Sequence, residues 1–80
     1  MHELGVLFHI VKTVVRITEE KGIKTVRHIA LEVGKASGFV PRYLQKLFPV
    51  AVDGYPPLQE AELRISTVDG TGLLIKEIGY

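Results

Sequence analysis

The C-terminal part of the sequence contains two strand-like segments joined by a turn signal, and it reads Glu62-Leu63-Arg64-Ile65-Ser66-Thr67-Val68-Asp69-Gly70-Thr71-Gly72-Leu73-Leu74-Ile75-Lys76-Glu77-Ile78. Residues 62–68 alternate between apolar and polar side chains, as expected for a strand with one buried face. Residues 69–72 indicate a tight turn, because Asp and Gly accept positive φ angles. Residues 73–78 follow as a last strand. The pattern predicts a β-hairpin at this end of the chain.

One more strand and two helices precede this hairpin. Residues 25–33 again alternate with a period of two, which predicts a strand. Before it, residues 3–21 carry apolar side chains at helical spacing, and Gly22 provides a left-handed stop. A second helix is expected to begin near Pro41 and to end around Phe48, because Pro49 lacks an amide donor. The apolar residues at helical spacing in the first helix are Leu4, Phe8, Val11, Val15 and Thr18, with Leu7 and Val14 beside them.

The predicted order of elements is α-β-α-β-β. A strand–helix–strand unit favours a parallel pair of strands, and the hairpin adds an antiparallel one. We therefore predict a single α+β domain over residues 1–80, with two helices packed on one face of a three-stranded mixed sheet. The side chains expected to be buried on the strands are Ile29, Leu31, Leu63, Ile65 and Ile75.

Composition limits the classes of function. The 80 residues include no Cys, so disulfides and thiolate zinc sites are excluded and a cytoplasmic location is expected. The net charge is only +1, with mixed acids and bases, which argues against a nucleic-acid or membrane partner. No membrane-length apolar run or signal peptide is recognisable. So small a core, together with a broad apolar first helix and an unpaired sheet edge, favours a homodimer.

The sequence offers no convincing enzymatic motif. Gly34-Lys35-Ala36 lacks the upstream glycine and the following Ser or Thr of a phosphate-binding loop. The two serines, Ser37 and Ser66, do not lie in a nucleophile elbow. We therefore predict no catalytic residues and no enzymatic activity.

The N-terminal tripeptide Met1-His2-Glu3 is the candidate metal site. The Met1 amine and the His2 amide can close a five-membered chelate ring on one ion, and the His2 imidazole closes a six-membered ring with that amide. The Glu3 amide or its carboxylate could supply a fourth donor. Such nitrogen-rich tetragonal coordination suits Ni(II) and Cu(II). The alternative is an ordinary polar helix start, in which Glu3 interacts favourably with the helix dipole.

The other histidines have simpler interpretations. His9 belongs to the polar stripe of the first helix, and His28 points outward from a predicted strand. They do not form the i, i+4 pair typical of a helical metal site. A helical rise of about 1.5 Å per residue also places His9 roughly 10 Å from His2 along the helix. Both are predicted to be solvated side chains.

The sequence as a whole resembles the HypA/HybF family of nickel metallochaperones. The opening Met1-His2-Glu3-Leu4 is similar to the family's N-terminal signature, and the resemblance spans essentially all 80 residues. Its other segments are Lys24-Thr25-Val26-Arg27, Leu31-Glu32-Val33-Gly34, Ser37-Gly38, Val40-Pro41 with Leu44 and Phe48, Glu60-Ala61-Glu62-Leu63-Arg64-Ile65 and Leu73-Leu74-Ile75-Lys76-Glu77-Ile78. Each segment is moderately specific alone, and their common order strengthens the resemblance.

One departure from the family concerns zinc. Family members carry two CxxC pairs that bind structural zinc between the last two strands. Here residues 66–68 pass through residues 69–72 directly into the last strand, as if a hairpin turn had replaced the zinc ribbon. Zinc is therefore not expected, and family functions that depend on the zinc module are in doubt.

The resemblance implies a nickel-binding accessory protein that holds Ni(II) labile and passes it to a nickel enzyme such as [NiFe]-hydrogenase or urease. It also implies a maturation GTPase as a partner. The implied nickel ligands are Met1, His2 and Glu3. The alternative hypothesis is a metal-independent protein-interaction module that has kept the fold without the zinc ribbon.

Overall fold

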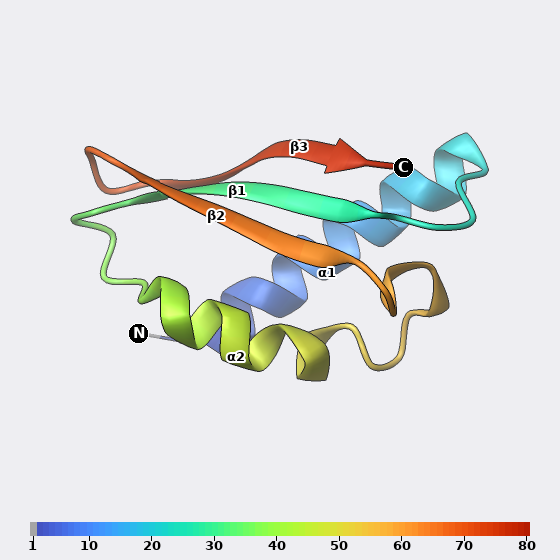
Figure 1. Ribbon diagram of the computed structural model, residues 1–80, viewed down its shortest axis with the longest axis horizontal. Helices are drawn as coiled ribbons and strands as arrows, with labels where there is room; N and C mark the ends of the chain where they lie inside the picture. The colour runs from blue at the N-terminus through green and yellow to red at the C-terminus, as the bar shows by residue number, and fades with distance from the viewer. Residues whose placement is uncertain (1) are drawn as a thin grey trace.

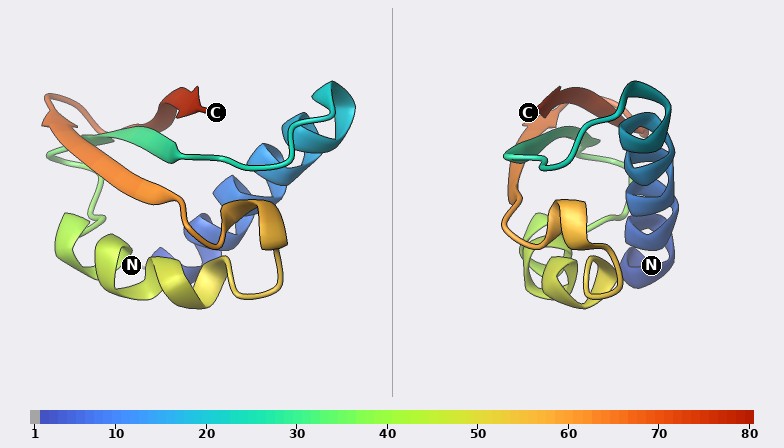
Figure 2. Two further views of the ribbon diagram at one scale, coloured as in Figure 1. Left: turned by 45° about the vertical axis from the view of Figure 1, so that its right-hand side comes forward. Right: turned by 90° about the vertical axis from the view of Figure 1, so that its right-hand side faces the viewer.

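Two helices lie on one side of a three-stranded mixed sheet, which confirms the predicted α+β fold (Figure 1). The computed structural model describes residues 2–80. Turned views show both helices on the same side of the strands (Figure 2). The elements are α1 (Glu3–Lys21), β1 (His28–Gly34), α2 (Pro41–Ala51), the short 3-10 helix η1 (Pro56–Leu58), β2 (Glu62–Val68) and β3 (Leu73–Gly79).

The sheet has the order β2-β1-β3, so the predicted hairpin is wrong in its pairing. β1 runs parallel to β2, with Ile29 beside Leu63, and antiparallel to β3, with Ile29 beside Ile78. β2 and β3 follow each other in sequence but lie on opposite sides of β1. Burial explains why β1 is central, because β1 carries the most apolar inner face. In the central position, β1 also forms hydrogen bonds along both of its edges. Residues 69–72 then have to cross two strand spacings, about 10 Å, which four residues can span.

The connection between β2 and β3 passes across the end of β1. Backbone amides of residues 34, 35 and 36 donate to carbonyls of Gly72, Val68 and Gly70 at 2.7, 2.8 and 2.9 Å, respectively. A Cβ on Gly34 would lie 2.4 Å from the Gly70 carbonyl oxygen. Glycine at position 34 therefore allows the crossing chain to approach the backbone closely.

The buried face of α1 is rotated slightly from the predicted one. Leu7, Val11 and Val14 are fully buried, whereas Phe8 is 40% exposed. Gly22 ends the helix in the left-handed conformation, at φ 67°, as predicted. The sequence correctly predicted an apolar face on this helix. Because apolar residues extend beyond one face, the sequence did not show which of them would be buried.

Two element boundaries differ from the predictions. β1 begins at His28 rather than at residue 25, and the Val26 amide before it donates to the Pro57 carbonyl, outside the sheet. α2 continues through Pro49 to Ala51. Pro49 lies in the last turn on the exposed side, so only one helical hydrogen bond is lost and water can solvate the freed carbonyl.

The hydrophobic core consists of buried apolar side chains between the sheet and the two helices. Three of the five predicted strand residues, Ile29, Leu31 and Leu63, are buried, whereas Ile65 of β2 and Ile75 of β3 are half-buried. Within residues 2–80, none of the helices is long and apolar enough to cross a membrane. The buried apolar residues are Leu7, Ile10, Val11, Val14, Val26, Ile29, Leu31, Val33, Leu44, Phe48, Ala51, Val52, Leu58 and Leu63.

Candidate metal site

His2 is the N-cap residue of α1 and is exposed to solvent. Its carbonyl oxygen accepts the first hydrogen bond of the helix, from the Val6 amide at 3.1 Å. Met1, the other part of the predicted chelate, lies outside the described residues. The imidazole of His2 is therefore accessible to an ion arriving from solvent.

The backbone amides at the start of α1 are not needed by the helix. The first N–H groups of any α-helix lack an acceptor within the helix, and those of His2 and Glu3 belong to this set. A metal ion could replace the protons of these amides without breaking a helical hydrogen bond. The local structure thus suits coordination through backbone nitrogen.

Glu3 makes a contact that the sequence analysis did not anticipate. Glu3 as a residue is only 8% exposed, and its carboxylate accepts a hydrogen bond from the Val40 amide at 3.1 Å. Val40 is the N-cap residue of α2 and has no side-chain cap of its own. The Val40 hydrogen bond lowers the pKa of the Glu3 carboxyl, while burial opposes it. Glu3 therefore connects the start of α1 to the positive end of α2.

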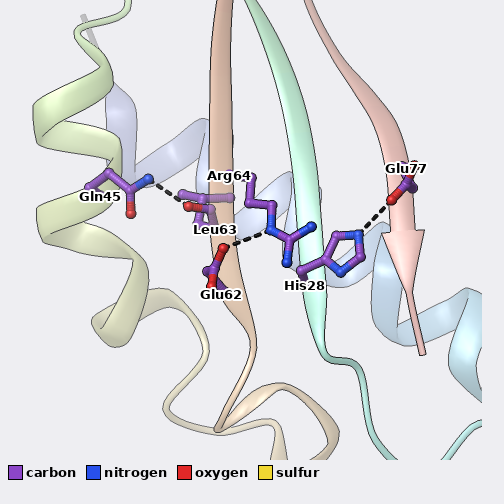
Figure 3. A network of polar contacts seen from close by, with 6 residues as sticks. All are labelled: His28, Gln45, Glu62, Leu63, Arg64 and Glu77. Carbon is purple, nitrogen blue, oxygen red and sulfur yellow. Dashed lines mark hydrogen bonds and ion pairs between the residues drawn. The ribbon is translucent and has the colours of Figure 1, made fainter.

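His9 and His28 lie elsewhere. His9 is exposed on α1, as predicted. His28 does lie on the outer face of β1, but its ring is only 15% exposed and bonds the Glu77 carboxylate on β3 at 2.6 Å (Figure 3). Its hydrogen bond and nearby charge lower the pKa of the Glu77 carboxyl. Sequence reasoning missed this pair because its members lie 49 residues apart.

The structure does not bring the three histidines together. Within residues 2–80, no group of three or more His, Cys, Asp or Glu side chains is arranged to hold a metal ion. Of the predicted tripeptide, His2 and Glu3 are adjacent at the start of α1, with the imidazole exposed and the carboxylate directed toward α2.

A family model and a solved structure both match this chain. A family model described as "Hydrogenase/urease nickel incorporation, metallochaperone, hypA" matches residues 1–73. The fold also matches a solution structure described as that of the Ni metallochaperone HypA from Helicobacter pylori, with a TM-score of 0.78. That match has 13% sequence identity and covers 96% of this chain and 72% of the other. No curated protein matches the sequence.

Proposed function

Because the chain belongs to the HypA family of hydrogenase/urease nickel-incorporation metallochaperones, we propose that it carries a nickel ion at Met1, His2 and Glu3. The observation that carries this proposal is the family match itself, which begins at residue 1 and so includes the tripeptide. The exposed imidazole of His2 and the unused amides at the start of α1 support it.

The proposed donors are four nitrogen atoms: the Met1 amine, the His2 amide, the His2 imidazole and the Glu3 amide. The Glu3 carboxylate is the less suitable fourth donor, because it already accepts the Val40 hydrogen bond. The positive end of a helix dipole disfavours a bare cation. Two deprotonated amides would balance the two charges of Ni(II) and remove this penalty.

The proposed role is transport rather than catalysis. An exposed site with few ligands lets an incoming donor replace the His2 imidazole, so the ion can pass to a second protein by ligand exchange. The proposed recipients, in the cytoplasm, are a maturation GTPase and then a client hydrogenase or urease. Zinc is not part of this role, since the sequence contains no Cys to supply thiolate ligands.

Isothermal titration with Ni(II) tests this proposal, using protein whose N-terminus is free. We expect one equivalent of nickel to bind, and His2→Ala or an N-terminal extension to abolish binding without changing the circular dichroism spectrum. His9→Ala and His28→Ala are matched controls, because each removes an imidazole outside the tripeptide. Full nickel binding by His2→Ala would refute the site.

Two further measurements define the ligands. Glu3→Gln keeps the Glu3 amide, so nickel affinity should persist if that amide is the fourth donor. Protons must leave the nitrogen donors on binding, so affinity should fall as the pH drops from about 7 to about 6. Absence of any nickel binding at neutral pH would favour the alternative, a metal-independent interaction module.

A further inference from the structure

β3 is a free edge of the sheet. It pairs with β1 on one side only. The other edge strand, β2, is partly covered because Gln45 of α2 donates a hydrogen bond to the Leu63 carbonyl at 2.6 Å (Figure 3). Within residues 2–80, no side-chain hydrogen bond reaches the backbone of β3. An exposed strand of this kind can accept a further strand.

An apolar groove runs beside this edge, between β3 and α1. Its two segments have volumes of about 410 and 510 Å³, and Thr13 and Ile75 line both of them. Val6, Ile10 and Ile17 of α1 form much of the opposite wall. A strand added to β3 could direct its helix-facing side chains into this groove.

The side chains of residues 75–78 have a mirror-symmetric pattern. The register of β3 against β1 shifts at Lys76, so Lys76 and Glu77 both lie on the open face of the sheet, where they approach Glu32 and His28 of β1 at 4.0 and 2.6 Å. Ile75 and Ile78 pack against the core on the helix side. The order from residue 75 to residue 78 is therefore in, out, out, in, symmetric about the bond between residues 76 and 77.

We propose that β3 pairs antiparallel with β3 of a second copy of this chain, around the midpoint of residues 76 and 77. Opposed residues in antiparallel strands share a face, so Lys76 lies opposite Glu77 of the partner subunit. The two-fold axis repeats this pair, which gives two complementary charge pairs. On the helix side, Ile75 lies opposite Ile78 of the partner subunit and extends the apolar face.

Neither neighbouring register keeps every pair on one face of the sheet. A slip of one residue in one direction sets Ile75 opposite Glu77 of the partner subunit. A slip in the other direction sets Ile78 opposite Lys76 of the partner subunit. Each slip therefore pairs a charged residue on the open face with an apolar residue on the helix face. In this register the pattern of β3 is complementary to itself. A second copy of this chain supplies that same pattern, whereas an unrelated peptide does not.

Sedimentation of three charge variants tests the pairing. The unaltered chain should dimerise, and Lys76→Glu or Glu77→Lys should each weaken the dimer by about tenfold or more, because like charges then face each other twice. The double variant Lys76→Glu/Glu77→Lys restores opposite charges across the two-fold axis and should restore the dimer. Because Lys76 and Glu77 also lie beside Glu32 and His28 of their own chain, the circular dichroism spectrum of each variant is compared with that of the unaltered chain to confirm folding. Lys46→Glu, a charge reversal on exposed α2, should have no effect. A chain that stays monomeric at high micromolar concentration would overturn the proposal.

Cross-linking provides a test that does not depend on charge. The chain has no Cys, so single cysteines report one contact each. A mixture of Lys76→Cys and Glu77→Cys proteins should form a disulfide between copies faster than either protein alone, because these positions are directly opposed. Equal rates in the mixture and in the separate proteins would exclude this register. Because neither residue belongs to the nickel site, nickel titration remains independent of both results.

Discussion

Gly34 is a single residue on which the path of the chain depends, because the β2–β3 connection crosses directly over it. We expect Gly34→Ala to reduce the free energy of unfolding by about 1–3 kcal/mol, since the new Cβ would lie 2.4 Å from the Gly70 carbonyl oxygen. Chemical denaturation measures this loss. Gly54→Ala is the matched control, because a Cβ there would meet no atom within 4 Å. Equal stabilities of the two variants would contradict the described crossing.

The His28–Glu77 pair makes stability depend on pH. The pKa of Glu77 is lowered in the folded chain, so its contribution is present above the ordinary value of about 4.5 and is lost as the pH falls through the folded value. The unaltered chain should therefore be more stable than Glu77→Gln near pH 6, and this difference should shrink as the pH falls below about 4.5. Urea denaturation across this range measures it. A difference that stayed constant down to pH 3 would contradict the ion pair.

Among the elements, β1 is the one on which the fold most depends. Leu31 lies at the centre of β1, between β2 and β3, and is only 1% exposed. Leu31→Ala should cost about 2–5 kcal/mol and lower the thermal midpoint by at least about 8 °C. Val50→Ala, on the exposed side of α2, should change the midpoint little. If both variants melted at the same temperature, the assignment of the inner face of β1 would be wrong.

The elements themselves were largely predictable, but their order in the sheet was not. Alternation on β1 and β2 correctly gave the faces of Ile29, Leu31 and Leu63, because side-chain direction is a local property. The turn at residues 69–72 was recognised, yet a turn signal does not reveal that a third strand lies between the two it joins. That outcome depends on which strand buries the most apolar surface, which is a property of the assembled sheet.

The candidate site was predictable for the same local reason. The donors proposed for nickel are adjacent in sequence, so no folding information was needed to group Met1, His2 and Glu3. The contact between Glu3 and Val40 spans 37 residues and could not be inferred from local pattern. It changes the interpretation of Glu3, because it directs the carboxylate to α2 and leaves the amide as the proposed donor.

At the scale of the whole molecule, the fold is expected to stand without any metal. The apolar core is built from both helices, β1 and β2, with half-buried side chains of β3 packed against it, and the sequence has no Cys for a structural zinc site. Adding a strong chelator should therefore leave the thermal midpoint unchanged, whereas structural zinc domains unfold under the same treatment. Adding Ni(II) should raise the midpoint, since a ligand that binds the folded state stabilises it. Unfolding by chelator would contradict this account.

The central claim is that nickel binds at the N-terminus, and the ring-proton signals of the histidines test it most directly. The chain has three histidines, and each reports a different place: His2 at the start of α1, His9 on its exposed face and His28 on the sheet. During titration with less than one equivalent of Ni(II), the His2 signals should shift or broaden first, while those of His28 stay unchanged. A first effect at His9 or His28, with His2 unaffected, would contradict the claim.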